Sequence, residues 1–153
     1  MVLHKPQDIV GLELPSFTAT AERGQLRDFA AVTGIADPRC RDLEAARTAG
    51  CPDLLVPPTF FFSLEFGRPD PGLVLRELGI DLREVLHGEQ RFAYHQLAFA
   101  GQELTMTGRV ADYYEKKGGA LRFVVRETEV TRSGEPVVTL TNVLVARRLE
   151  LAR

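Results

Sequence analysis

The chain has 153 residues and a mass of 17.0 kDa, and 44% of its residues are hydrophobic and 26% charged. This length suits a single domain, and the composition excludes a disordered chain, a collagen-like repeat and a disulfide scaffold. Nineteen Lys and Arg against 21 Asp and Glu leave a net charge of −2. Because the two signs are interspersed, no basic face for nucleic acid is predicted.

The front half of the chain is predicted to form short helices. Apolar residues at helical spacing indicate a helix over residues 20–33, with Thr18 or Thr20 as its cap. Residues 42–49 show the same pattern, with Asp42 as the N-cap. A glycine directly after each pattern is predicted to end the helix.

A more hydrophobic helix is predicted for residues 59–66, after a Pro-rich loop at residues 54–58. Its sequence is apolar nearly all round, so it must be buried on most sides. Glu65 is the exception, and we expect it to face outward at the helix end; inside the core it would need a partner or a raised pKa. One more short helix is predicted for residues 71–79.

After Asp81 the apolar period changes from about 3.6 to 2, which indicates strands. These are predicted at residues 90–97, 104–114, 121–125 and 136–147, with residues 131–135 as a hairpin turn. In the second of them Leu104, Met106, Val110 and Tyr114 are expected on one face, and Gly108 is a bulge or close-approach point. The last strand is apolar on both faces, which is typical of a central strand.

We therefore predict one α+β domain over residues 1–153, in which an antiparallel sheet packs against one buried helix. Cys40 and Cys51 belong to no CxxC motif and are expected to be reduced. The N-terminus has no signal-peptide pattern, and no uncharged apolar run is long enough to span a membrane. A cytoplasmic protein without membrane contacts is expected.

The sequence gives little support for a metal site or for a catalytic serine. The chain has three histidines, His4, His87 and His95, which are too few for most metal sites. No metal or cofactor is expected. The serines lack the strand-to-helix context of a catalytic nucleophile: they are Ser16, Ser63 and Ser133.

One stretch carries a motif, and it reads Gly34-Ile35-Ala36-Asp37-Pro38-Arg39-Cys40-Arg41-Asp42, followed by an alanine-containing helix. It resembles the signature Gly-Asp-x-Asn-Pro-(Ile/Leu)-His-x-Asp of the MaoC-like dehydratases and R-specific enoyl-CoA hydratases, which have the hotdog fold. Residues 50–60 resemble the family's link into its central helix, and residues 87–95 resemble the opening strand of the dehydratase half-domains. The resemblance covers residues 8–148 and implies a single hotdog domain whose sheet wraps around the central helix.

Aligned on this motif, the chain departs from the family where the chemistry occurs. The catalytic Asp falls on Ile35, the Asn on Asp37 and the catalytic His on Cys40. Adding water to an enoyl thioester needs a base near the water and a group that returns a proton. Isoleucine can do neither, and a thiol is poorly suited to the histidine role. We therefore expect no catalytic residue here, with Asp37 as the fallback candidate.

The resemblance implies that substrate binding can survive this loss. It identifies the substrate as an acyl-CoA or acyl-carrier-protein thioester, and it points to these contact residues: Val56, Pro58, Thr59, Phe60, Phe61, His87, Gly88 and His95. Plain core packing is the alternative for the phenylalanines, and a structural role is the alternative for the histidines. Lys116 and Lys117 beside Tyr113 and Tyr114 can meet a CoA phosphate or form a solvated hairpin tip.

The leading hypothesis is a non-catalytic, acyl-chain-binding subunit of a heteromeric (R)-specific enoyl-thioester hydratase or 3-hydroxyacyl-thioester dehydratase. It would pair with a MaoC-like catalytic subunit, with a second copy of itself, or with both, because an open sheet edge invites association. One alternative is a homodimeric hotdog hydratase or acyl-CoA thioesterase that uses Asp37, Asp53 or Glu65. The other is an acyl-thioester-binding protein without turnover.

Overall fold

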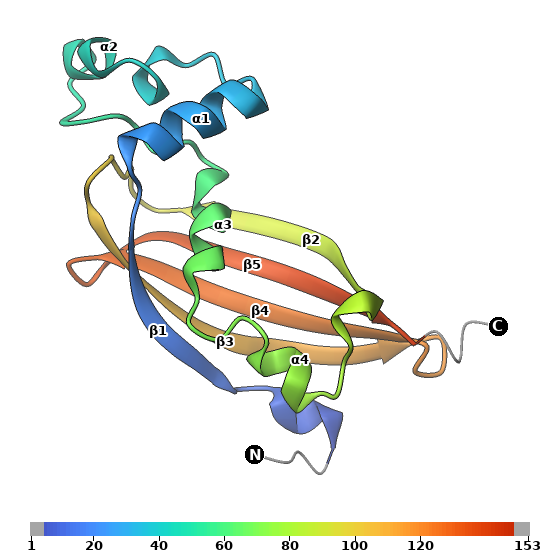
Figure 1. Ribbon diagram of the computed structural model, residues 1–153. Helices are drawn as coiled ribbons and strands as arrows, with labels where there is room; N and C mark the ends of the chain where they lie inside the picture. The colour runs from blue at the N-terminus through green and yellow to red at the C-terminus, as the bar shows by residue number, and fades with distance from the viewer. Residues whose placement is uncertain (1–4, 149–153) are drawn as a thin grey trace.

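The computed structural model describes residues 5–148, which form a five-stranded antiparallel sheet with helices over one face and beyond one end (Figure 1). The predicted α+β class is confirmed. The strands follow the order β1 (Glu13–Thr20), β3 (Glu103–Lys116), β4 (Leu121–Arg132), β5 (Glu135–Arg147) and β2 (Val85–Tyr94). Strand β5 lies between β4 and β2, as its two apolar faces predict, and β1 and β2 are the sheet edges.

The helices fall into two groups. In Figure 1, α1 (Arg23–Thr33) and α2 (Leu43–Thr48) lie beyond one end of the sheet. Helix α3 (Phe60–Leu64) crosses in front of the sheet, and α4 (Leu73–Glu77) lies nearer the opposite end. Four 3-10 turns complete the description: η1 (Pro6–Ile9), η2 (Pro38–Cys40), η3 (Glu65–Gly67) and η4 (Leu82–Glu84).

The start of α1 corrects the sequence prediction. Thr18 and Thr20 are not helix caps but the end of β1, where they pair with Thr105 and Glu103 of β3. The helix begins at Arg23, and a capping box closes it: the Gln25 side chain accepts a hydrogen bond of 3.1 Å from the Glu22 N–H. The β-branched threonines are also well suited to a paired strand.

Helix α2 forms as predicted, because the Asp42 carboxylate accepts a 2.7 Å hydrogen bond from the Ala45 N–H. Helix α3 is less completely enclosed than expected. Phe60, Phe61 and Leu64 are buried, but Phe66 is 77% exposed. The chain tightens into η3 after α3, and this change of period turns Phe66 away from the core.

The predicted strands differ from the structure in three places. Strand β4, predicted at residues 121–125, continues to Arg132, and the turn predicted at residues 131–135 is confined to Ser133 and Gly134. Strand β2 begins at Val85 and ends at Tyr94, so it starts earlier and stops earlier than residues 90–97. In β3 the register shift lies between Val110 and Asp112, so Tyr113 is buried and Tyr114 is exposed, not aligned with Leu104. Gly108 is a close-approach point, because a Cβ there would lie 3.1 Å from the Arg68 guanidinium.

The covered face of the sheet carries two apolar clusters separated by polar residues. The larger surrounds α3 and includes Phe61, Leu104, Met106, Val130 and Leu140. The smaller lies towards α4 and includes Ile9, Val74, Val110 and Val124. Between Val124 and Val130 the same face of β4 presents Arg126 and the buried Thr128. Charged and polar side chains therefore cross the middle of the core.

Candidate functional site

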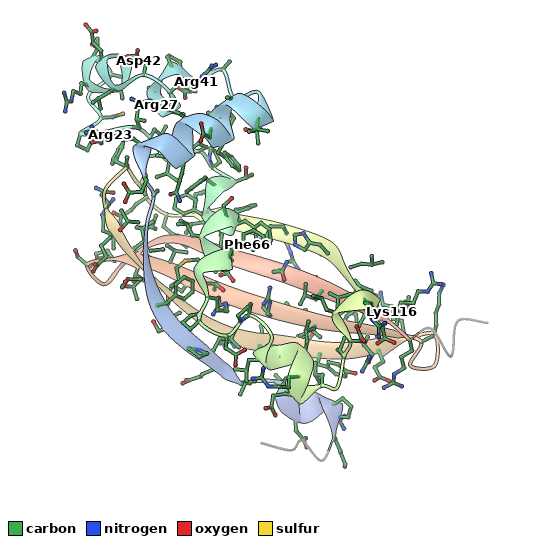
Figure 2. The ribbon with its side chains drawn as sticks, in the orientation of Figure 1. Arg23, Arg27, Arg41, Asp42, Phe66 and Lys116 are labelled. Carbon is green, nitrogen blue, oxygen red and sulfur yellow. The ribbon has the colours of Figure 1, made fainter. Side chains whose placement is uncertain are left out.

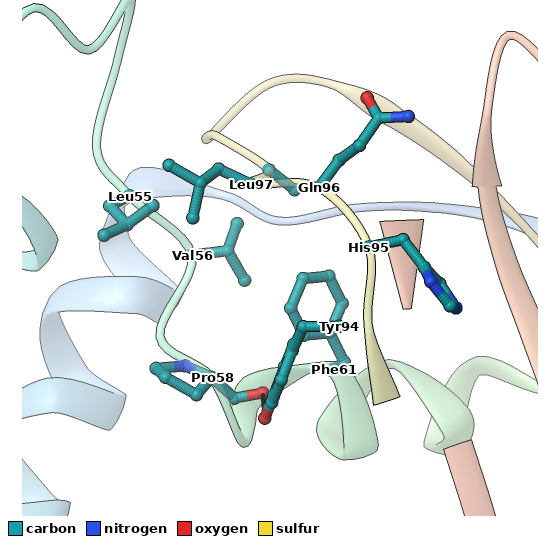
Figure 3. A pocket seen from close by; sticks show the side chains of 9 residues that line it. Leu55, Val56, Pro58, Phe61, Tyr94, His95, Gln96 and Leu97 are labelled. Atoms are coloured by element: carbon teal, nitrogen blue, oxygen red, sulfur yellow. Dashed lines mark hydrogen bonds between the residues drawn. The ribbon is translucent and has the colours of Figure 1, made fainter. Parts of the chain in front are cut away.

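A cavity of about 280 Å³ lies where the chain enters α3 (Figure 3). One wall is the segment before α3 with the first turn of that helix, and the other is the end of β2 with the residues that follow it. The lining is mainly apolar and consists of Leu55, Val56, Pro58, Phe61, Tyr94, His95, Gln96, Leu97 and Ala98. An apolar cleft with a few polar groups is the usual form of a small-molecule site.

Backbone pairing fixes the two walls. The Val56 N–H donates to the Ala98 carbonyl at 2.9 Å, and the Ala100 N–H donates to the Leu54 carbonyl at 2.9 Å. Across the mouth, the Tyr94 hydroxyl donates to the Pro58 carbonyl at 2.9 Å, and the Tyr94 ring packs 6.4 Å from that of Phe61. The Pro-rich loop is thereby held in a set conformation against the end of β2.

The motif residues that stand where the family has its catalytic pair lie in apolar surroundings beside one wall of the cavity. Ile35, like Phe99, packs against a buried cluster formed by Ala30, Cys40 and Leu55. Cys40 is 1% exposed, and burial raises the pKa of its thiol. A buried neutral thiol and an isoleucine supply no acid–base pair.

Asp37, the fallback candidate, is bound to a neighbouring arginine. Its carboxylate accepts a 2.9 Å hydrogen bond from the Arg39 N–H and forms a 2.7 Å ion pair with the Arg39 guanidinium. These bonds lower the pKa of Asp37. A carboxylate held in its charged form in this way is a weak proton acceptor.

The predicted contact residues are only partly brought together. Val56, Pro58, Phe61 and His95 line the cavity. Thr59 is exposed outside it, and Phe60 points into the core, where it packs edge-on against Phe29 with ring centroids 5.3 Å apart. Sequence reasoning missed five lining residues: Leu55, Tyr94, Gln96, Leu97 and Ala98. The one feature of the sequence that could have identified these five residues is that they lie close to Val56 or His95 in the chain.

His87 and Gly88 lie elsewhere on β2. The His87 ring stacks on Phe62 with centroids 5.0 Å apart and contacts the Asn142 amide. At Gly88 a Cβ would lie 2.6 Å from Cγ2 of Val145. Glycine is therefore required there by packing between β2 and β5.

Two further candidates also fall outside the cavity. Glu65 does not face outward as expected: its side chain is 12% exposed and forms a 2.8 Å ion pair with Arg68. Lys116 lies at the end of the sheet away from α1 and α2 (Figure 2), with its ammonium over the Tyr114 and Phe123 rings. This position is that of a hairpin tip.

An ion pair between α1 and the loop that leads to the cavity gives a pH-dependent prediction. The Arg23 guanidinium binds Asp53 at 2.7 Å and holds the pKa of that carboxyl at about 2, below its ordinary 3.8. We expect Asp53→Asn to lower the free energy of unfolding at pH 7 by roughly 0.5–1 kcal/mol, because the pair is partly exposed. Because the pKa of Asp53 is lower in the folded protein than in the unfolded chain, the ion pair stabilises the fold fully above about pH 4. This stabilisation is lost as the pH falls towards 2.

Urea unfolding of wild type and Asp53→Asn at pH 7, 5 and 3 measures this effect. The difference between them should be the same at pH 7 and 5 and smaller at pH 3. An equal difference at all three values would contradict the assignment of the ion pair.

Residues 8–140 match the family described as "FAS1-like, dehydratase domain region". The chain belongs to this family. A UPF0336 protein of Streptomyces coelicolor is 37% identical to it over 148 residues, which cover 95% of this chain and 97% of the relative. A UPF0336 protein of Saccharopolyspora erythraea is 37% identical over 142 residues, covering 92% and 90%.

Solved structures similar to this FAS1-like dehydratase region have the hotdog fold, which confirms the fold prediction. The C-terminally truncated HadBC (3R-hydroxyacyl-ACP dehydratase) complex from Mycobacterium tuberculosis aligns with a TM-score of 0.78 and 25% identity, covering 93% of this chain and 100% of that one. R-hydratase PhaJ1 from Pseudomonas aeruginosa aligns with a TM-score of 0.68 and 19% identity, covering 91% and 82%.

Among residues 5–148, no three His, Cys, Asp or Glu side chains gather as metal ligands, and His4 lies outside these described residues. In the same part of the chain, no helix has the length and apolarity needed to cross a membrane.

Proposed function

We propose that this chain is the acyl-chain-binding, non-catalytic subunit of a heteromeric (R)-specific enoyl-thioester hydratase or 3-hydroxyacyl-thioester dehydratase. The observation that carries the proposal is a contrast at one place in the fold. The motif positions Ile35 and Cys40 are apolar or buried, while a cavity with a mainly apolar lining lies beside them. Binding is supported there, and acid–base chemistry is not.

An acyl group suits this cavity. Its walls are formed largely by Leu55, Val56, Phe61 and Leu97. The thioester chain gains affinity there by removing apolar surface from water. The polar groups at the rim, Tyr94 and His95, already have protein partners in Pro58 and Thr139. These bonds hold both side chains in place at the rim.

The edge of the sheet supports association with a partner. β2 is an edge strand, and Leu86 and Tyr94 on it are 62% and 49% exposed. An unpaired strand edge with apolar side chains is a template for pairing. Two solved structures that share this fold are described as complexes, HadBC and ChsH1–ChsH2. We infer a partner with the hotdog fold that supplies the missing Asp and His, in a cytoplasmic setting.

The test is hydration of crotonyl-CoA, followed as loss of enoyl-thioester absorbance. The chain alone should show no turnover, and a mixture with a MaoC-like subunit that carries Asp and His should turn over at least about 10⁴-fold faster, because both acid and base are absent here. Size-exclusion chromatography should show the two chains eluting together.

Comparable turnover by the chain alone would overturn the proposal. Asp37→Asn would then test the fallback base, and release of free thiol would identify a thioesterase. Binding of crotonyl-CoA with no turnover under any condition, the partner included, would favour the non-enzymatic alternative.

A further inference from the structure

A second cavity, of about 460 Å³, lies below the end of α3, between α4 and the strands β4, β5 and β2. None of its lining residues lines the first cavity. They are Phe62, Glu65, Phe66, Arg68, Pro71, Leu75, Leu82, Val85, His87, Arg126, Asn142 and Leu144. The proposed function uses none of the charged groups among them.

The deepest charged group is Arg68, whose side chain is only 2% exposed. Its Nη2 donates to both Glu65 oxygens, at 3.0 and 2.8 Å, and to the Thr128 hydroxyl at 3.2 Å. Its Nε and Nη1 are buried and have no hydrogen-bond partner among residues 5–148. An unpaired N–H of a buried cation is costly to leave in a protein interior.

A second guanidinium, Arg126 of β4, enters the same cavity. Its Nη2 donates to the Asn142 side-chain oxygen at 2.9 Å, and its buried Nε has no partner in the described part of the chain. Burial lowers the pKa of Arg126, and the positive charge of Arg68 lowers it further, while Glu65 opposes this change. Among the residues that line this cavity, Glu65 therefore supplies the one carboxylate for two cations.

The charge balance favours an anion. Arg68 and Arg126 together carry two positive charges, and Glu65 carries one negative charge, so the pair of arginines retains one positive charge. A planar guanidinium binds a carboxylate through two parallel N–H donors, and three such donors lie unpartnered here. One bound carboxylate would neutralise the remaining positive charge and accept hydrogen bonds from the unpartnered N–H donors.

The mouth of the cavity is apolar. Phe66, which follows α3 (Figure 2), is 77% exposed, and Leu82 is 73% exposed. Phe62, Leu75 and Leu144 continue this surface inward. A ligand that contacts all of it must carry hydrocarbon next to its charge. We propose that this cavity binds an amphipathic monocarboxylate, with its carboxylate on Arg68 and Arg126 and its hydrocarbon chain against Phe66 and Leu82.

The test is calorimetric titration of the full chain with hexanoate, hexanamide and inorganic phosphate. Hexanoate should bind with saturation at one site. Hexanamide, of the same length without the charge, should bind at least about tenfold more weakly, as should phosphate, which lacks the hydrocarbon chain. Equal affinity for hexanoate and hexanamide, or no saturable binding of hexanoate, would overturn the proposal.

Variants locate the bound acid. Phe66→Asp places a negative charge at the mouth on an exposed position and should weaken hexanoate binding at least about tenfold. Val32→Asp is the matched control, because Val32 is 85% exposed on α1, and it should leave the affinity unchanged. Arg126→Met should abolish binding in the folded protein. Equal affinities for Phe66→Asp and Val32→Asp would overturn the assignment even if Arg126→Met does not fold.

The two proposals can fail independently. Leu97→Asp changes the first cavity only, at a residue that is 59% exposed, so it should leave hexanoate binding unchanged. A negative crotonyl-CoA result with the partner would remove the proposed function and leave the carboxylate site untouched. Loss of hexanoate binding in Leu97→Asp would place the acid in the first cavity and overturn the inference.

Discussion

Replacing Glu65 with Gln is expected to lower the free energy of unfolding by about 3 kcal/mol. Arg68 would then remain charged and buried, with the Thr128 hydroxyl as its hydrogen-bond acceptor and the Phe17 ring 5.3 Å from its guanidinium. Arg126, which also lies near Glu65, would lose the same compensating charge. The cost arises because a buried cation cannot recover its hydration when its counterion is removed.

Equilibrium urea unfolding measures this change, and Glu127→Gln is the matched control. Glu127 pairs with Arg109 at 2.8 Å, but both side chains are exposed, 37% and 55% respectively. The same change of charge there should cost less than about 1 kcal/mol. Adding Arg68→Met to Glu65→Gln should recover part of the loss, because apolar replacement of both partners removes the uncompensated charge. Similar costs for Glu65→Gln and Glu127→Gln would show that the cluster does not depend on this carboxylate.

Gly88→Ala is expected to destabilise the protein by about 1–3 kcal/mol. The new Cβ would lie 2.6 Å from Cγ2 of Val145 and 3.2 Å from the Val143 carbonyl oxygen. Valine is stiff at χ1, so the strands β2 and β5 must separate to make room.

Thermal unfolding of three variants tests this explanation. Gly88→Ala should lower Tm, and Gly88→Ala with Val145→Ala should recover most of that loss relative to Val145→Ala alone, because the clashing methyl group has been removed. The difference between these pairs is a coupling energy, which is expected only for side chains in contact. If Gly88→Ala lowers Tm by the same amount with and without Val145→Ala, the clash with Val145 is excluded. It would return Gly88 to the list of possible ligand contacts.

The candidate site was anticipated in part. The motif comparison placed Ile35 and Cys40 where the family's chemistry occurs, and both pack with Leu55, which lines the cavity. Phe61 and His95 were predicted contacts and do line it. Phe60, one residue from Phe61, was not distinguishable from it in the sequence. In a helix neighbouring residues point about 100° apart, and both phenylalanines are buried, so only the tertiary structure shows that Phe61 is the one that lines the cavity.

Elements that depend on nearby residues followed from the sequence alone. The Asp42 cap of α2 joins residues three positions apart, and the turn at Ser133 and Gly134 between β4 and β5 has positive φ at both, 51° and 83°. Such features need only local hydrogen bonds and backbone conformation. The apolar faces of β5 likewise determined that this strand lies inside the sheet.

Features that join distant residues were decided by the tertiary structure. Strand β1 is recognisable only through its pairing with β3, about 90 residues later, because Pro15 and a bulge interrupt its alternation. No local motif marks Arg68, Arg126 and Asn142 as neighbours, and only the folded sheet places them around one cavity. Burial and shared counterions are properties of the packed chain, and no local pattern encodes them. The sequence alone thus determined the fold class and the absence of the motif's acid–base pair, while packing decided where the charged cavity lies.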